Sequence, residues 1–174
     1  ISESGGGSAT LNGAAAISVT LASGTEVATL TGLSASAAPS AIDFGDDAAT
    51  LTLAEFNALT AASIALTTAD TVTLDAANSD DVSGITLTGV DSITVGNGET
   101  VTVSIAQKSL VNASGSGAYN VKDTLANIIS ESGGGSATLN GAAAISVTLA
   151  SGTEVATLTG LSASAAPSAI DFGD

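Results

Sequence analysis

The chain has 174 residues, and its 17 acidic side chains against two Lys give a formal net charge of −15 at pH 7. This balance excludes nucleic-acid binding through the usual contacts of Lys and Arg with phosphate, and it argues against anionic membrane surfaces. His and Cys are absent, which removes the commonest general base and every thiol nucleophile, so we expect no enzymatic activity. Aromatic residues form only 2% of a chain that is 44% apolar, which predicts a thin core of small aliphatic side chains.

Short strands are the dominant local prediction along the chain. Each candidate alternates β-branched or apolar residues with Thr or Ser, the pattern of a half-buried strand. In chain order, the clearest candidates cover residues 17–21, 27–30, 72–74, 85–87, 93–95 and 101–103.

Short helices are predicted to interrupt the strands at three places. Thr52 is followed by Glu55 at the spacing of a capping box, and Ser104 and Gln107 repeat that spacing. The candidate helices cover residues 51–59, 103–110 and 123–128.

The expected fold is all-β: a mainly parallel β-solenoid with short helical elbows. Ile85, Ile93 and Val101 are eight residues apart and are separated by corners rich in Gly, as expected for even short strands on a solenoid path. The alternative is a series of tandem antiparallel β-sandwich domains, because Asn97-Gly98 also suits a tight hairpin. The scarcity of aromatic residues favours the solenoid, since sandwich cores usually contain a central Trp or Tyr.

An internal repeat is the most informative feature of the sequence. Residues 1–46 recur without change as residues 129–174, at an offset of 128. Self-similarity at a fixed period is typical of tandem arrays. We therefore interpret residues 1–128 as one full copy of a tandem repeat and residues 129–174 as the start of the next identical copy, in a continuous rod. The natural context is expected to be a longer tandem protein.

Three phrases resemble a known class of protein. They are Tyr119-Asn-Val-Lys-Asp-Thr-Leu-Ala-Asn-Ile128, Leu51-Thr-Leu-Ala-Glu-Phe-Asn-Ala-Leu59 and Ala69-Asp-Thr-Val-Thr-Leu74. Together they resemble the giant repetitive secreted and surface proteins of Gram-negative bacteria, which include adhesins, surface-layer-like proteins and biofilm matrix proteins. The resemblance implies export, an extracellular, cell-surface or matrix location, and frequently calcium. The calcium-binding Gly-Gly-x-Gly-x-Asp motif of many such proteins is absent here.

A candidate calcium site follows from clustered acids. Asp43, Asp46 and Asp47 surround Phe44 and Gly45, and hard oxygen ligands close in sequence suit Ca²⁺. The alternative is that these residues form a turn, where Asp bonds its own backbone. Ca²⁺ is the one cofactor that the sequence suggests.

The predicted function is that of a structural repeat in an extracellular bacterial fibre, sheath or surface layer, which spaces or joins cells. The expected partners are further copies, through end-to-end or lateral self-association, and components of the cell surface or matrix. No apolar run approaches the roughly 18 residues of a membrane span, so no membrane insertion is expected.

Two alternative functions stay open at this level. One is the stalk region of a calcium-dependent adhesin. The other is an ice-binding β-solenoid with rows of Thr-x-Thr pairs on one face. The candidate pairs are Thr29/Thr31, Thr50/Thr52, Thr71/Thr73, Thr86/Thr88 and Thr100/Thr102.

Overall fold

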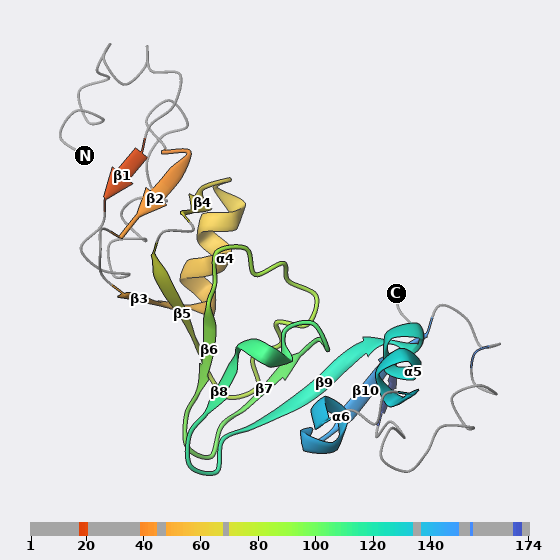
Figure 1. Ribbon diagram of the computed structural model, residues 1–174. Coiled ribbons are helices and arrows are strands. Elements are labelled where there is room, and N and C mark those ends of the chain that lie inside the picture. Colours follow the sequence, from red (N-terminus) through yellow and green to blue (C-terminus); the bar gives the residue numbers. More distant parts are fainter. Residues whose placement is uncertain are drawn as a thin grey trace. The chain divides into compact units, whose positions relative to one another are not determined.

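The computed structural model describes residues 18–20, 39–44, 48–67, 70–133, 137–149, 154 and 169–171 (Figure 1). The chain divides into two compact units. The first unit contains Ile1–Asp75 and Leu87–Ile93, and the second contains Ala76–Thr86 and Thr94–Asp174. Both units are built from short strands in small sheets, with helices beside them.

A three-stranded parallel sheet belongs to the first unit. Its strands are β1 (Ser18–Thr20), β2 (Ala41–Asp43) and β4 (Ala65–Leu66), in the order β1-β2-β4. Ser18 lies opposite Ala41, which in turn lies opposite Ala65. β1 is therefore an edge strand of this sheet within the described part of the chain.

A second set of strands, most of whose residues lie in the first unit, supplies further buried residues. β3 (Ala48–Thr52) and β5 (Thr71–Ala76) pair in parallel, from Ala48 opposite Thr71 to Thr52 opposite Asp75, and β6 (Ser92–Val95) follows β5 in the strand order. Alternate residues point inward, so apolar side chains are buried while Thr and Asp face outward, as the period of two requires. The buried residues are Ala49, Leu51, Val72, Leu74, Ala76, Ile93 and Val95.

Helix α4 (Leu53–Ala61) begins at a complete capping box. The Glu55 amide donates to Thr52 Oγ1 over 3.3 Å, and the Thr52 amide donates back to Glu55 Oε2 over 2.8 Å. Both bonds satisfy amides that the first helical turn leaves without intrahelical partners. Phe56 and Leu59, three residues apart, are buried on one face and anchor the helix.

A four-stranded parallel sheet forms the centre of the second unit. Its strands are β7 (Thr100–Val103), β9 (Ala118–Thr124), β10 (Ile145–Thr148) and β11 (Ala169–Asp171), in the order β11-β10-β9-β7. Val101, Val103, Val121 and Val147 are fully buried on the inner face of this sheet. The buried residues of this unit are mainly aliphatic, as the sequence predicts, and Tyr119 on β9 is buried with them.

Two turns stack on each other beside this sheet. Residues 96–99 connect β6 to β7, and residues 114–117 connect β8 (Val111–Ala113) to β9, after the 3-10 helix η2 (Lys108–Leu110). The Ser114 amide donates to Val95 O over 3.0 Å, and the Ala118 amide donates to Glu99 O over 2.9 Å. The stacking leaves no space for a side chain at Gly117, whose added Cβ would lie 2.7 Å from Gly96 O.

Two helices follow β9. In α5 (Leu125–Gly133), Leu125 and Ile128 are buried three residues apart, which fixes one face of the helix inward. The shorter α6 (Ala137–Gly141) is attached through Tyr119, whose hydroxyl donates to Thr138 O over 2.7 Å. Figure 1 shows β9 and β10 side by side, with both helices next to them.

The expected all-β, mainly parallel β-solenoid with helical elbows is wrong. The fold is mixed α/β, with the strands divided among three small parallel sheets and with helices α4, α5 and α6. Short alternating stretches predict strands, but they do not say which sheet each strand joins. β6 and β7, separated by one turn, enter different sheets.

The alternative of tandem antiparallel β-sandwich domains is also wrong. Each strand pair whose register the structure describes is parallel. The turn at Asn97-Gly98 exists, with Gly98 at φ +80°, but its flanking strands diverge instead of forming a hairpin.

Candidate functional site

The junction between successive sequence copies is a strand ladder inside the second unit. β9 is the last strand of the first copy and β10 is the first described strand of the second, and the two strands pair in parallel over four residues. The register places Val121 opposite Ile145, Lys122 opposite Ser146 and Asp123 opposite Val147. Helix α5 spans the change of copy, from Leu125 in the first to Gly133 in the second. The copies are therefore joined by backbone pairing as well as by the covalent chain.

The identical sequences of the two copies form identical strand pairs. In the first copy, Ser18 lies opposite Ala41. In the second copy, the corresponding Ser146 lies opposite Ala169, and the register is the same along both pairs. The local sequence therefore specifies this pairing independently of which compact unit contains it.

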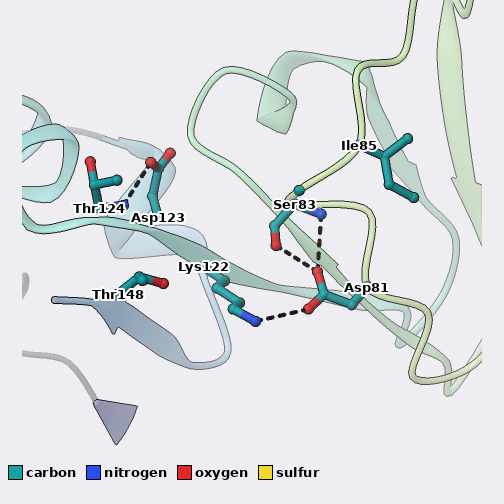
Figure 2. A pocket seen from close by; sticks show the side chains of 8 residues that line it. Asp81, Ser83, Ile85, Lys122, Asp123, Thr124 and Thr148 are labelled. Carbon is teal, nitrogen blue, oxygen red and sulfur yellow. Dashed lines mark hydrogen bonds and ion pairs between the residues drawn. The ribbon is translucent and has the colours of Figure 1, made fainter. Parts of the chain in front are cut away.

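An open cleft of about 470 Å³ lies over β9 and β10 in the second unit (Figure 2). Lys122 reaches from β9 toward Asp81, with Nζ 3.4 Å from Oδ2, and Thr148 enters from β10. Ser83 donates twice to the other oxygen of Asp81, from its amide over 3.0 Å and from its hydroxyl over 2.6 Å. The cleft therefore combines one ion pair with hydroxyl groups.

Asp81 and Lys122 form a partly exposed ion pair in the cleft. Partial burial favours the neutral form of Asp81, but the hydrogen bonds from Ser83 and the charge of Lys122 outweigh it, so the pKa of Asp81 lies below its ordinary value of 3.8. The Asp81 and Lys122 side chains are 44% and 34% exposed, so solvent screens their attraction. Asp81 and Lys122 carry opposite charges within ion-pair distance, and Ser83, Asp123, Thr124 and Thr148 line the same cleft. The ion pair links the segment around Asp81 to β9.

Asp and Asn side chains bind backbone amides of distant segments throughout the described chain. Asp123 is the clearest case, because its Oδ2 accepts from the Ile105 amide over 3.0 Å while Oδ1 accepts from Asn127 Nδ2 over 2.6 Å. Four others follow the same pattern at separations of 19 to 26 residues: Asp70 to Phe44, Asp91 to Val72, Asn78 to Thr100 and Asn97 to Ser116. These side chains satisfy amides in loops and near the starts of β5 and β7, a role that the sequence does not predict because the partners are distant.

The predicted calcium ligands are only partly described. Asp43 is half-buried on β2, whereas Asp46 and Asp47 lie outside the described residues. Within the described part of the chain, no three acidic side chains form a group able to hold a metal ion. The calcium site stays a prediction.

One buried carboxylate adjoins the predicted calcium ligands. Asp70 is 6% exposed, and its Oδ2 accepts from the Phe44 amide over 2.9 Å and from Thr67 Oγ1 over 2.7 Å. Its Oδ1 is the one buried side-chain oxygen in the described residues that has no hydrogen-bond partner. Such an atom calls for a ligand or solvent partner, because an unsatisfied buried polar group is costly.

The described Thr-x-Thr pairs do not align in a single sheet. Thr50 on β3 lies opposite Thr73 on β5, and Thr73 Oγ1 lies 2.9 Å from the Ser92 hydroxyl on β6, which gives a short hydroxyl row. The remaining pairs are distributed elsewhere: Thr100/Thr102 on β7 of another sheet, Thr86/Thr88 outside the strands, and Thr29/Thr31 beyond the described residues. The ice-binding alternative stays a prediction without a supporting observation.

Comparison of this chain with protein families, curated proteins and solved structures finds no match. In the described residues, no helix has the length and apolar character needed to span a membrane. The resemblance to giant secreted proteins of Gram-negative bacteria stays a prediction. A functional proposal for this chain therefore depends on its own residues.

Proposed function

We propose that this chain is a structural repeat of an extracellular bacterial fibre, sheath or surface layer, which spaces or joins cells. The observation that supports this proposal best is the β9–β10 ladder, which pairs the end of one sequence copy with the start of the next. A slack linker would let copies move independently, whereas a ladder with Val121 and Val147 fully buried beneath it resists bending between copies.

The use of polar side chains supports the same proposal. Several acidic and amide side chains of the described residues accept hydrogen bonds from backbone amides, as Asp91 does from the amide of Val72 over 2.8 Å. The sequence has no His, Cys or Arg, so it lacks the residues of most catalytic and phosphate-binding sites. A negatively charged surface also keeps neighbouring molecules soluble at high density outside the cell.

The test is the length of engineered arrays. Chains with one, two or three additional 128-residue copies are imaged by negative-stain electron microscopy. A structural repeat predicts stiff particles whose length increases by a constant amount with each copy. A matched variant replaces Val147 and its counterpart in every copy with Asp, which places a charge at a buried junction position, and it is expected to give bent or collapsed particles. Compact particles, or flexible strings from the unmodified arrays, would refute the proposal.

Calcium-dependent adhesion is the second candidate function, and Asp70 favours it. Its unpartnered Oδ1 is a hard oxygen ligand, and its Oδ2 is bonded to the amide of Phe44, the residue that follows the predicted ligand Asp43. Under this proposal, the chain is part of a stalk that Ca²⁺ stabilises. Bound Ca²⁺ would also reduce the self-repulsion of a chain with net charge −15.

A chelator experiment tests the calcium proposal. Ca²⁺ is expected to raise the thermal midpoint, and EDTA is expected to reverse the increase. Asp70→Asn should abolish the response, because it keeps a carbonyl oxygen for the Phe44 amide but removes the charge. Asp75→Asn, on the exposed side of β5, is the matched control and should keep it. An unchanged midpoint with and without Ca²⁺ removes calcium from the account.

A further inference from the structure

The two copies of one strand differ in how many neighbours they have. β10 lies between β9 and β11, so both of its edges are paired. β1 has the same sequence, yet it lies at the end of its sheet and pairs with β2 alone among the described residues. Among the described residues, no strand pairs with the edge of β1 that corresponds to the edge through which β10 binds β9.

The opposite end of the four-stranded sheet shows the converse relationship. β11 is an edge strand in the described part of the chain, whereas its copy β2 also pairs with β4, where Ala41 lies opposite Ala65. The four-stranded sheet has β9 on one side of the shared strand pair, and the three-stranded sheet has β4 on the other side of it. When β10 and β11 are superimposed on β1 and β2, the two sheets give one continuous strand order.

We propose that consecutive copies of this repeat build one five-stranded parallel sheet across their junction, in the order β7-β9-β1-β2-β4, and that the edge of β1 that has no strand partner among the described residues binds the β9 strand of a preceding copy. The three-stranded and four-stranded sheets are then two incomplete forms of this sheet. The binding partner of the β1 edge is a strand of the same repeat. The inference deepens the proposed structural function and rests on it.

The physical basis is strand addition to a sheet edge. An edge strand presents a row of unpaired amides and carbonyls, and a parallel strand in register satisfies them. The register is specified by burial, because Val121 on β9 and its partner Ile145 on β10 are buried, while Lys122, the residue after Val121, is not. A shift of one residue would turn the charged Lys122 toward the core, so only one register suits the junction.

The partner must come from an additional copy. In this chain β9 is already paired with β10, so it is not available to β1 of a second molecule. A preceding copy in the same chain supplies a second β9 at high effective concentration through a short connection. The connection would have the natural sequence, because the residues that follow residue 128 in this chain are identical to those that begin at residue 1.

Disulfide trapping in an extended chain tests the pairing. A second copy of residues 76–128 is fused before Ile1, and the native sequence contributes no Cys. Two matched pairs join the added β9 to β1: Lys122→Cys in the added segment with Ser18→Cys, and Thr124→Cys in the added segment with Thr20→Cys. They reproduce the observed partners Lys122/Ser146 and Thr124/Thr148. Neighbouring strands are about 4.8 Å apart, within the range that a disulfide spans.

Two further variants make the result decisive. The reference pair is Lys122→Cys with Ser146→Cys in the unextended chain, where the pairing is observed. The mismatched pair combines Lys122→Cys in the added segment with Thr20→Cys. We expect the matched pairs to oxidise as fast as the reference pair and about tenfold faster than the mismatched pair, which is out of disulfide range. Circular dichroism of each reduced variant checks that it is folded.

The inference is overturned if the reference pair forms its disulfide while both matched pairs stay reduced or oxidise no faster than the mismatched pair. Failure of the reference pair itself would also overturn it, because the template pairing would then be absent. Neither result depends on the length of multi-copy particles, so this inference and the proposed function fail separately.

Discussion

Lys122 on β9 is the strand partner of Ser146 on β10, although the two residues belong to successive copies of the repeat. The covalent connection between them passes through α5, whose buried residues Leu125 and Ile128 hold it close to the sheet. This junction connects successive copies through parallel strand pairing and buried aliphatic residues. Its consequences can be measured with single substitutions.

The first prediction concerns two adjacent residues of α5. Ile128 is fully buried and Ile129 is 37% exposed. Ile128→Ala should lower the free energy of unfolding by about 2–5 kcal/mol, because it removes buried contacts and leaves a cavity. Ile129→Ala, the matched control, should change it by less than about 0.5 kcal/mol. Urea denaturation followed by circular dichroism measures both. Equal effects would show that α5 does not anchor the junction in this orientation.

The second prediction concerns the stacked turns. A Cβ at Gly117 would lie 2.7 Å from Gly96 O and 2.9 Å from Val95 O, whereas a Cβ at Gly84 meets no atom within 4 Å. Gly117→Ala should therefore destabilise the protein by about 1–3 kcal/mol, since the backbone of the neighbouring turn must move. Gly84→Ala should be close to neutral. A Gly117→Ala variant with the thermal midpoint of the native chain would contradict the stacking.

The third prediction concerns Gln107, which is buried and connects two segments. Its Nε2 donates to Val82 O over 2.8 Å and to Ile85 O over 2.7 Å. Gln107→Ala leaves both carbonyls without this donor, at a cost of about 1–3 kcal/mol for each one that stays buried. Hydrogen exchange should increase in residues 82–85. Asn112→Ala, on exposed β8, is the control and should leave exchange there unchanged.

The fourth prediction is a pH dependence that originates at Asp81. The pKa of this carboxyl is lower in the folded protein than its ordinary value of 3.8, so the charged form stabilises the fold. That stabilisation is fully present above pH 3.8 and is lost as the pH falls through the lowered pKa. Asp81→Asn should therefore be less stable than the native chain at pH 7, and the difference should disappear in stronger acid. A difference that is constant with pH, measured by urea denaturation, would exclude this role.

Local features of the fold could be predicted from the sequence. Thr52 and Glu55 form the predicted capping box, and α4 begins within two residues of the predicted helix because capping depends on near neighbours. The strands predicted at residues 72–74, 93–95 and 101–103 are confirmed in β5, β6 and β7. The strand predicted at residues 17–21 is confirmed as β1.

Non-local features could not be predicted. Gln107 Oε1 accepts from the Ser104 amide as a capping residue would, but its amide group bonds to residues more than 20 positions earlier, and only a turn and η2 form where a helix is predicted. No strand forms at residues 85–87, where Ile85 O accepts from Gln107 instead. The Asp81–Lys122 pair spans 41 residues, beyond any local pattern.

The central claim is that successive copies are coupled through the β9–β10 ladder. Urea denaturation of arrays with increasing numbers of copies tests it most directly, because copies that share interfaces stabilise one another. The denaturation midpoint is expected to rise as the first copies are added and then to level off. A midpoint that is the same for every number of copies would contradict it, since independent domains unfold without regard to their neighbours.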